Sequence, residues 1–190
     1  MTLTQLFHLL GEARRLSSHD EFVIIGSLSV LGISEGMEIP VEMTMSQDVD
    51  CYTKADPGRV FDLVQALGEG SEYEAQTSFY LDAVSPDLPT LPDGWQTRLL
   101  KISHGPLTAW FLEPNDAAVS KYARGEPRDI RWIRAGVEAG IVSLPTVRYR
   151  FRETVFLNAK EQADARALYE TDVNWFETLR APVSTKSSTN

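Results

Sequence analysis

Apolar residues in the N-terminal third of the chain change their spacing several times. Over residues 4–16 they recur at helical intervals, which predicts an amphipathic helix. An apolar run over residues 21–25 has the length of a buried strand, and Gly26-Ser27 predicts a turn into a short helix that ends near residues 32–36. Residues 42–52 then alternate between large apolar and small polar side chains, which predicts a second strand.

Turn residues and further changes of spacing divide the middle of the chain. Asp56-Pro57-Gly58 indicates a turn before a helix over residues 60–67. Residues 76–84 return to alternation and carry Asp82, so they predict a third strand. Prolines and aspartates over residues 85–94 indicate a loop. A hairpin is expected from the strand-like residues 98–103 and 107–112.

Beyond Pro114 the apolar spacing is mostly helical. Helices are expected at residues 117–122, 130–141 and 158–179, whereas residues 144–155 fit no single period. Strands and helices alternate first and helices follow, so the expected fold class is α/β (α+β), with a mixed β-sheet core flanked by helices and a helical C-terminal portion. The expected boundaries are 1–112 for the core, 113–182 for the helical portion packed on it, and 183–190 for a disordered tail.

The composition is that of an ordinary globular protein. Of the 190 residues, 43% are hydrophobic and 24% are charged. No apolar run approaches the ~20 residues of a membrane span. The single cysteine, Cys51, excludes an internal disulfide and fits a reducing compartment, so we expect a cytoplasmic protein without membrane association. The net charge of −9 argues against broad non-specific DNA binding, which depends on neutralising phosphates.

Two carboxylates of the second predicted strand share a face. Because successive strand side chains point to opposite faces, Asp48 and Asp50 lie together, with Val49 and Cys51 behind them. Asp82 on the third predicted strand supplies a third acid. Magnesium prefers hard oxygen ligands, so these three aspartates are the predicted metal ligands and catalytic residues of a two-ion site. The alternative is that they are ordinary solvent-facing strand residues.

The Gly26-Ser27 turn adds a feature suited to phosphate. Glycine lets the backbone approach a ligand closely, and a serine at a helix start can offer its hydroxyl and amide to a phosphate. This turn after an apolar strand, followed by a helix and then Asp48-Val49-Asp50 on a strand, resembles the signature of the DNA polymerase β-like nucleotidyltransferase superfamily. A nucleotidyltransferase-like fold is therefore expected.

The resemblance extends over roughly residues 20–140. The chain is similar to a group of small bacterial nucleotidyltransferase-like proteins whose relatives include toxins of abortive-infection and type IV toxin–antitoxin systems. The segments that carry this likeness are Ile25-Gly26-Ser27-Leu28-Ser29-Val30-Leu31-Gly32, Asp48-Val49-Asp50-Cys51-Tyr52, Leu91-Pro92-Asp93-Gly94-Trp95-Gln96-Thr97-Arg98-Leu99, Phe111-Leu112-Glu113-Pro114-Asn115-Asp116 and Ser120-Lys121-Tyr122-Ala123-Arg124-Gly125-Glu126-Pro127-Arg128-Asp129.

The resemblance implies roles for the residues that match. Gly26 and Ser27 would bind the nucleoside triphosphate, while Asp48, Asp50 and Asp82 would bind Mg²⁺. Lys121 matches the group's lysine, and it would be a catalytic and nucleotide-binding residue that neutralises phosphate charge. Its alternative is a surface lysine on a helix.

The pair Arg128-Asp129 matches a basic residue followed by an aspartate in the group, which implies a further contact with the nucleotide. Asp129 has an alternative role as a structural partner of Arg128 or Lys121. The chain departs from the group at Leu28, where many relatives carry a longer polar residue, and at Trp132, where the toxins often repeat an aspartate.

The leading hypothesis is a Mg²⁺-dependent enzyme that transfers a nucleoside monophosphate from a nucleoside triphosphate to a hydroxyl of RNA, such as tRNA, or of a protein. It would be a toxin–antitoxin component with a cognate antitoxin as partner. The competing hypothesis is a catalytically silent binding protein that keeps the fold, or an antitoxin-like partner. A Mg²⁺-dependent hydrolase using the same acids is weaker, because no additional positioned base can be identified.

Overall fold

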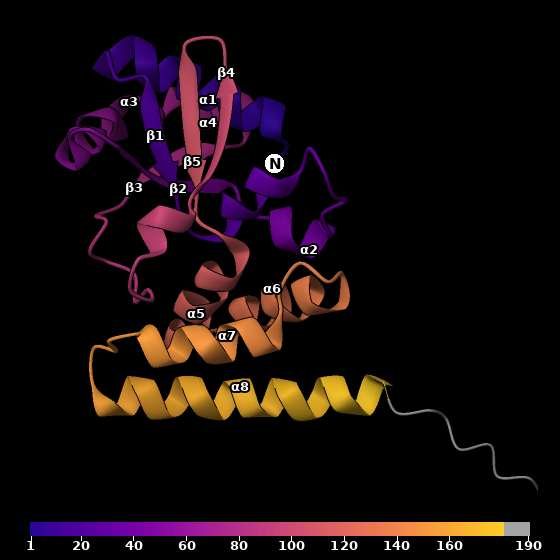
Figure 1. The fold of residues 1–190 in the computed structure, drawn as a ribbon. Coiled ribbons are helices and arrows are strands. Elements are labelled where there is room, and N and C mark those ends of the chain that lie inside the picture. Colours follow the sequence, from indigo (N-terminus) through magenta and orange to yellow (C-terminus); the bar gives the residue numbers. More distant parts are fainter. Residues whose placement is uncertain (181–190) are drawn as a thin grey trace, which may run out of the picture.

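A mixed β-sheet organises the upper part of the computed structural model, which describes residues 1–180 (Figure 1). Its strands are β1 (Glu21–Ile24), β2 (Asp48–Thr53), β3 (Tyr80–Ala83), β4 (Leu100–His104) and β5 (Leu107–Phe111). They lie in the order β3-β2-β1-β5-β4. The pairs β1–β5 and β2–β3 are parallel, whereas β1–β2 and β4–β5 are antiparallel. This mixed sheet confirms the predicted fold class.

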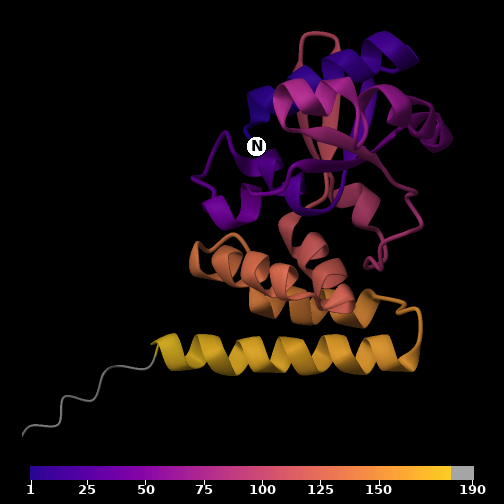
Figure 2. The ribbon, with the colours of Figure 1, turned by 180° about the vertical axis from the view of Figure 1, so that it is seen from behind.

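Helices from the N-terminal half cover one face of the sheet (Figure 2). They are α1 (Leu3–Ser17), α3 (Val64–Leu67) and α4 (Glu72–Thr77), together with the 3₁₀ helix η2 (Pro57–Leu63). Leu6, Leu10 and Ala13 of α1 have no exposed surface, so its predicted apolar stripe is the face packed into the core. A capping box between Thr2 and Gln5 fixes where α1 begins.

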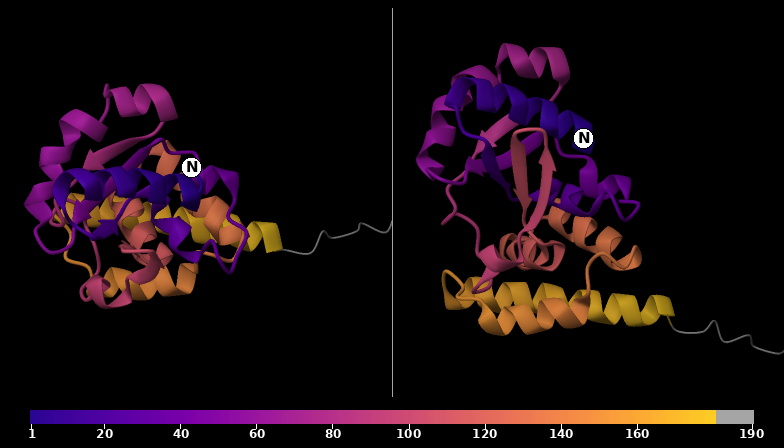
Figure 3. Two further views of the ribbon diagram at one scale, coloured as in Figure 1. Left: turned by 90° about the horizontal axis from the view of Figure 1, so that it is seen from above. Right: turned by 45° about the horizontal axis from the view of Figure 1, so that its top comes forward.

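The C-terminal helices form layers beyond the sheet, with the longest one outermost (Figures 1 and 3). They are α5 (Pro114–Arg124), α6 (Pro127–Glu138), α7 (Leu144–Arg150), η4 (Phe151–Glu153) and α8 (Ala159–Arg180). Residues 144–155, which fitted no single period, are thus largely helical. None of the helices in the described part of the chain has the length and apolar character to cross a membrane. The predicted tail, 183–190, lies outside the described residues.

A buried polar group ties α8 to the other helices. Asp172 of α8 is 1% exposed, and it accepts hydrogen bonds from the Tyr122 hydroxyl at 2.9 Å and from Arg134 Nε at 2.8 Å. The Tyr122 ring meets Phe151 and Tyr169 edge to face, with centroids 5.8 and 5.9 Å away. Burial of this carboxylate is tolerated because it is paired and hydrogen-bonded.

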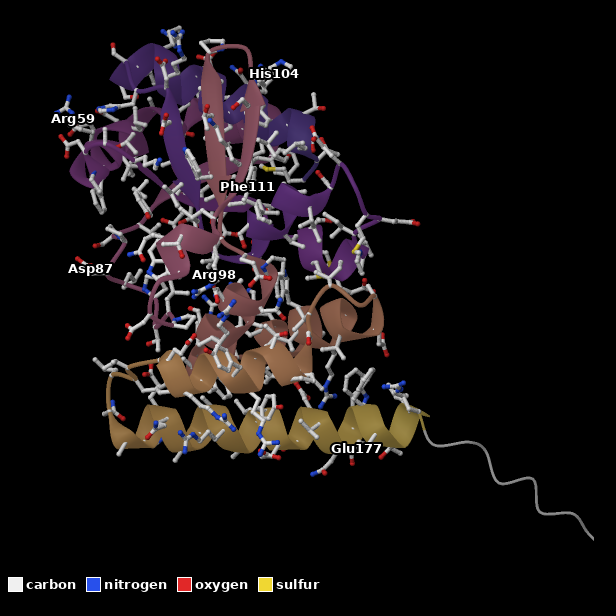
Figure 4. All side chains as sticks on the ribbon, in the orientation of Figure 1. Arg59, Asp87, Arg98, His104, Phe111 and Glu177 are labelled. Atoms are coloured by element: carbon white, nitrogen blue, oxygen red, sulfur yellow. The ribbon has the colours of Figure 1, made fainter. Side chains whose placement is uncertain are left out.

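The connection after β3 is held between the sheet and the helices. It ends in the 3₁₀ helix η3 (Trp95–Arg98), and Arg98 points from there toward the helical layers (Figure 4). Arg98 Nε donates to the buried carboxylate of Asp116 at 2.7 Å, and Arg150 Nε lies 3.1 Å from the same group. The loop over residues 85–94 is therefore anchored at its C-terminal end.

Three sequence predictions are corrected. Residues 42–52 are not one strand, because α2 (Val41–Thr44) begins after Pro40 and buries Met43, and β2 starts only at Asp48. Residues 76–84 begin inside α4, whose N-cap Ser71 accepts from Glu74 N, and β3 starts at Tyr80. The helix expected at 60–67 is divided between η2 and α3. In the first two cases the alternation of polar and apolar residues begins before the strand and includes part of the preceding helix.

Candidate active site

Three carboxylates meet at one edge of β2 and β3. Asp48 and Asp50 lie on the same face of β2, and Asp50 is the direct neighbour of Asp82 in the parallel pairing with β3. Each residue offers an oxygen, and the three oxygens lie within 4.8 Å of one another. Val49 and Cys51 on the opposite face are fully buried, as the alternation predicted. The structure thus brings the three predicted acids together.

The charges in this cluster are poorly compensated. Burial, followed by the negative charges of Asp48 and Asp82, raises the pKa of Asp50 from 3.8 to about 7, although Lys121 and Arg124 act in the opposite direction. Burial and the charge of Asp48 also raise the pKa of Asp82. The three adjacent carboxylates supply hard oxygen ligands, but their negative charges repel one another. A bound divalent cation would compensate those charges. The residues therefore fit Mg²⁺.

Gly26 is held against the acidic cluster. Its φ of 69° and ψ of −154° belong to a region almost restricted to glycine. A β-carbon built at this position would lie 1.8 Å from Asp50 Oδ2, and the neighbouring Ile25 N–H donates to the Asp50 carbonyl at 2.9 Å. Ser27 then starts the 3₁₀ helix η1 (Ser27–Ile33). The predicted turn therefore lies directly beside the predicted metal ligands.

Lys121 of α5 is buried and points at this turn. Its side chain is 4% exposed, and Nζ donates to Ser27 Oγ at 2.8 Å and to Asp129 Oδ1 at 3.3 Å. Burial lowers the pKa of Lys121, while the charge of Asp129 opposes that shift. The ring of Trp132 lies 4.8 Å from Nζ, and its indole N–H donates to the carbonyl oxygen of Ser27 at 3.1 Å. Lys121 is thus not a surface lysine.

Asp129 of α6 is fully buried and holds two cations. Besides Lys121, it accepts a hydrogen bond from Arg124 Nε at 2.7 Å. Burial alone would raise the pKa of Asp129, but the hydrogen bond and charge of Arg124, together with Lys121, lower it. Arg128 lies apart from this group, since its side chain is 61% exposed and its Nε lies 2.8 Å from Glu126 Oε2. Asp129 is consequently a structural partner of Lys121 and Arg124.

A cavity of about 400 Å³ opens beside these residues. At one end it is lined by Gly26, Asp50, Lys121 and Arg124, and its other polar lining residues include Thr90 and Glu161. Apolar side chains complete the wall: Ile25, Val84, Leu88, Pro89, Leu112, Ala117 and Ala123. Sequence reasoning assigned no role to Arg124, Thr90 or Glu161. Arg124 had a usable signal, because it lies three residues after Lys121 on the same helix.

The family model described as "Nucleotidyltransferase of unknown function (DUF6036)" matches residues 4–181 of the chain. No curated protein and no solved structure gives a match.

Proposed function

Because the chain belongs to this nucleotidyltransferase family, we propose that it transfers a nucleoside monophosphate from a nucleoside triphosphate to a hydroxyl in a Mg²⁺-dependent reaction. One observation carries the proposal. The three carboxylates Asp48, Asp50 and Asp82 converge next to Gly26, with a cavity lined by Asp50, Lys121 and Arg124 beside them. The site thus combines ligands for a cation with cations for a polyphosphate.

The aspartates would hold the metal. Asp48 and Asp50 supply oxygens from one strand, and Asp82 supplies one from the next. When bound there, Mg²⁺ would polarise the phosphate and lower the pKa of the attacking hydroxyl. Asp50 is the ligand most dependent on the metal, because its own surroundings oppose its ionisation at neutral pH.

The backbone and the cations would position the triphosphate. Gly26 has no side chain, so the turn packs directly against the Asp50 carboxylate, and a phosphate bound by the turn would lie beside the metal ligands. Lys121 is a compact charge that can exchange its contact with Ser27 Oγ for a phosphate oxygen. Asp129 fixes Lys121 and Arg124 through its carboxylate oxygens, and it would thereby orient both cations without touching the substrate.

The acceptor that we propose is a hydroxyl of RNA, such as tRNA, or of a protein. This part of the proposal is supported by the resemblance to nucleotidyltransferase toxins, as is a role in a toxin–antitoxin pair with a cognate antitoxin. The chain's overall charge of −9 favours recognition of a particular acceptor over general affinity for nucleic acid.

A direct test incubates the protein with each of the four α-labelled triphosphates, Mg²⁺, and either pooled tRNA or cell protein. Label should enter one acceptor pool, and a chelator should abolish the transfer. Asp48→Asn and Asp50→Asn should each reduce transfer by at least ~10³-fold, because the metal loses a charged ligand. Asp62→Asn is a matched control, since its carboxylate is 57% exposed and pairs with Arg59.

Transfer that persists in both site variants would contradict the proposal. If no label transfers to any acceptor but nucleotide binding requires Mg²⁺ and both aspartates, the result would favour a catalytically silent binding protein instead. Calorimetric titration of the same variants with each triphosphate distinguishes these outcomes.

A further inference from the structure

Glu161 is a second carboxylate that lines the cavity, and it does not belong to the acidic cluster. It belongs to the first turn of α8, whereas the metal ligands lie on β2 and β3. A carboxylate would repel a triphosphate, so this residue needs another role if the cavity holds a nucleotide. The following inference rests on the proposed function and concerns the part of the nucleotide that is not phosphate.

The spacing along α8 separates Glu161 from the phosphate-binding end. A β-carbon built on Gly125, the residue after Arg124, would lie 2.9 Å from Leu168 Cδ1. Glu161 precedes Leu168 by seven residues, so it lies ~10 Å further along the helix axis. A nucleotide with its phosphates at Lys121 and Arg124 would therefore extend its base toward Glu161, between apolar side chains such as Val84, Leu88 and Pro89.

The orientation of Glu161 is fixed by two neighbours. Thr90 Oγ1 donates to its two carboxylate oxygens, at 3.2 and 3.3 Å, and the Leu157 N–H donates to Oε2 at 2.6 Å. A carboxylate has about four lone-pair positions, so these two donors leave acceptor capacity free. Because the Thr90 hydroxyl donates to Glu161, its remaining capacity is also that of an acceptor. This end of the cavity thus offers hydrogen-bond acceptors.

We propose that Glu161, oriented by Thr90, selects guanine nucleotides. An end that presents acceptors requires a base edge that presents donors. Guanine carries a ring N–H and an exocyclic amino group side by side, which match a carboxylate in a bidentate arrangement. Adenine and cytosine place a ring acceptor beside their amino group, and uracil flanks its ring N–H with two carbonyls. Each of these would direct a lone pair at the carboxylate.

The test measures calorimetric affinities for GTP, ITP, ATP, CTP, UTP and inorganic tripolyphosphate in Mg²⁺. ITP differs from GTP only by lacking the exocyclic amino group. The wild-type protein should bind GTP about tenfold more tightly than ITP, since one hydrogen bond to a charged acceptor is lost. Glu161→Gln should weaken GTP binding about tenfold, remove the preference over ITP, and leave tripolyphosphate binding unchanged.

Two further variants separate recognition of the base from an effect of the Glu161 substitution on α8 itself. Glu177→Gln makes the same chemical change on the outer side of α8 (Figure 4) and should leave every affinity unchanged. Thr90→Val leaves α8 intact and should reduce the preference for GTP over ITP several-fold, because Glu161 loses the hydroxyl that orients it.

The outcomes distinguish this inference from the function on which it rests. If tripolyphosphate and all nucleotides fail to bind, the proposed function and the inference fail together. If tripolyphosphate binds but the bases are not distinguished, only the inference fails. An equal loss for every nucleotide in Glu161→Gln would place the carboxylate on the ribose and would also overturn it.

Discussion

Gly26 and Asp50 are in such close contact that residue 26 has no room for a side chain. A β-carbon there would lie 1.8 Å from Asp50 Oδ2 and 2.7 Å from its carboxyl carbon. The turn before η1 and the metal-ligand candidate on β2 are thus parts of one packed unit. A change at Gly26 must move either the turn or the carboxylate.

Gly26→Ala should greatly slow transfer while leaving most of the fold intact. The methyl group displaces the Asp50 carboxylate, and the backbone conformation adds ~1–3 kcal/mol of strain in a non-glycine residue. We expect at least a ~10²-fold loss of transfer rate, because a displacement of about 1 Å in a catalytic group is sufficient for such a loss. Initial rates and urea unfolding measure the two effects.

Gly70→Ala is the matched control for this variant. Gly70 has a similar φ of 78°, but a β-carbon at this position would have no atom within 4 Å. The Gly70→Ala variant should lose stability because of backbone strain, and it should keep the transfer rate of the wild-type protein. Equal rates in the two alanine variants would show that the contact with Asp50 has no catalytic importance.

Without metal, Asp50 should destabilise the protein as pH rises. Its pKa is about 7 in the folded state against an ordinary 3.8, so the folded protein binds more protons over this interval. The free energy of unfolding therefore falls between pH ~4 and ~7, by at most about 4 kcal/mol at ~1.4 kcal/mol per pKa unit. Asp50→Asn removes this penalty and should be more stable than the wild type at pH 8.

Urea unfolding in a chelating buffer at pH 5 and pH 8 measures this difference. The advantage of Asp50→Asn should be larger at pH 8, and adding Mg²⁺ should reduce it by stabilising the wild-type protein through binding. An advantage that does not change with pH would mean that Asp50 ionises normally in the folded state.

Arg124, and not Arg128, should contribute to nucleotide affinity. Arg124 lines the cavity, whereas Arg128 is exposed and pairs with Glu126. Arg124→Gln should weaken triphosphate binding about tenfold, a typical effect of losing one charged contact. Arg128→Gln should change it less than about twofold, since exposed ion pairs contribute little. Titration calorimetry provides the comparison, and the reverse ranking would restore Arg128 as the nucleotide contact.

Asp172→Ala should lower both stability and nucleotide affinity. The substitution leaves the buried Tyr122 hydroxyl without its acceptor, which costs ~1–3 kcal/mol, and it also removes the partner of Arg134. Because α8 also carries Glu161, loosening the helix should weaken binding in the cavity. Urea unfolding and calorimetry measure the two effects.

Asp164→Ala on the same helix is the control, since Asp164 is 57% exposed and pairs with the exposed Lys160. It should cost less than ~1 kcal/mol. If both variants lost the same stability, the buried network would not be what holds α8 in place.

The sequence was most informative where one local pattern determined both structure and chemistry. The apolar run over residues 21–25 has the length of a buried strand and contains β1, and the alternation from Asp48 to Cys51 placed two carboxylates on one face. These features do not depend on distant parts of the chain. The long α8 and the β4–β5 hairpin were equally clear, because their periods and turn residues agreed.

Predictions were less accurate where contacts between distant segments determine the secondary structure or the surroundings of a side chain. Met43 alternates with polar residues as a strand residue would, but packing against α6 makes its segment helical. The sequence left Asp129 as a nucleotide contact or as a structural partner of Arg128 or Lys121, and only the structure shows that Lys121 and Arg124 are the cations it contacts. Glu161 carried no signal at all, since only the packing of α8 on α5 brings it to the cavity.

The position of α8 has a consequence for biosynthesis. Ribosomes make chains from the N-terminus, and a domain generally folds as a unit once its elements have been made. The three aspartates and the turn at Gly26 are made early, but Glu161 and the anchoring Asp172 are among the later described residues. A nascent chain therefore carries its metal ligands well before it has the residues of the cavity wall, and substrate binding should develop only once α8 has been made.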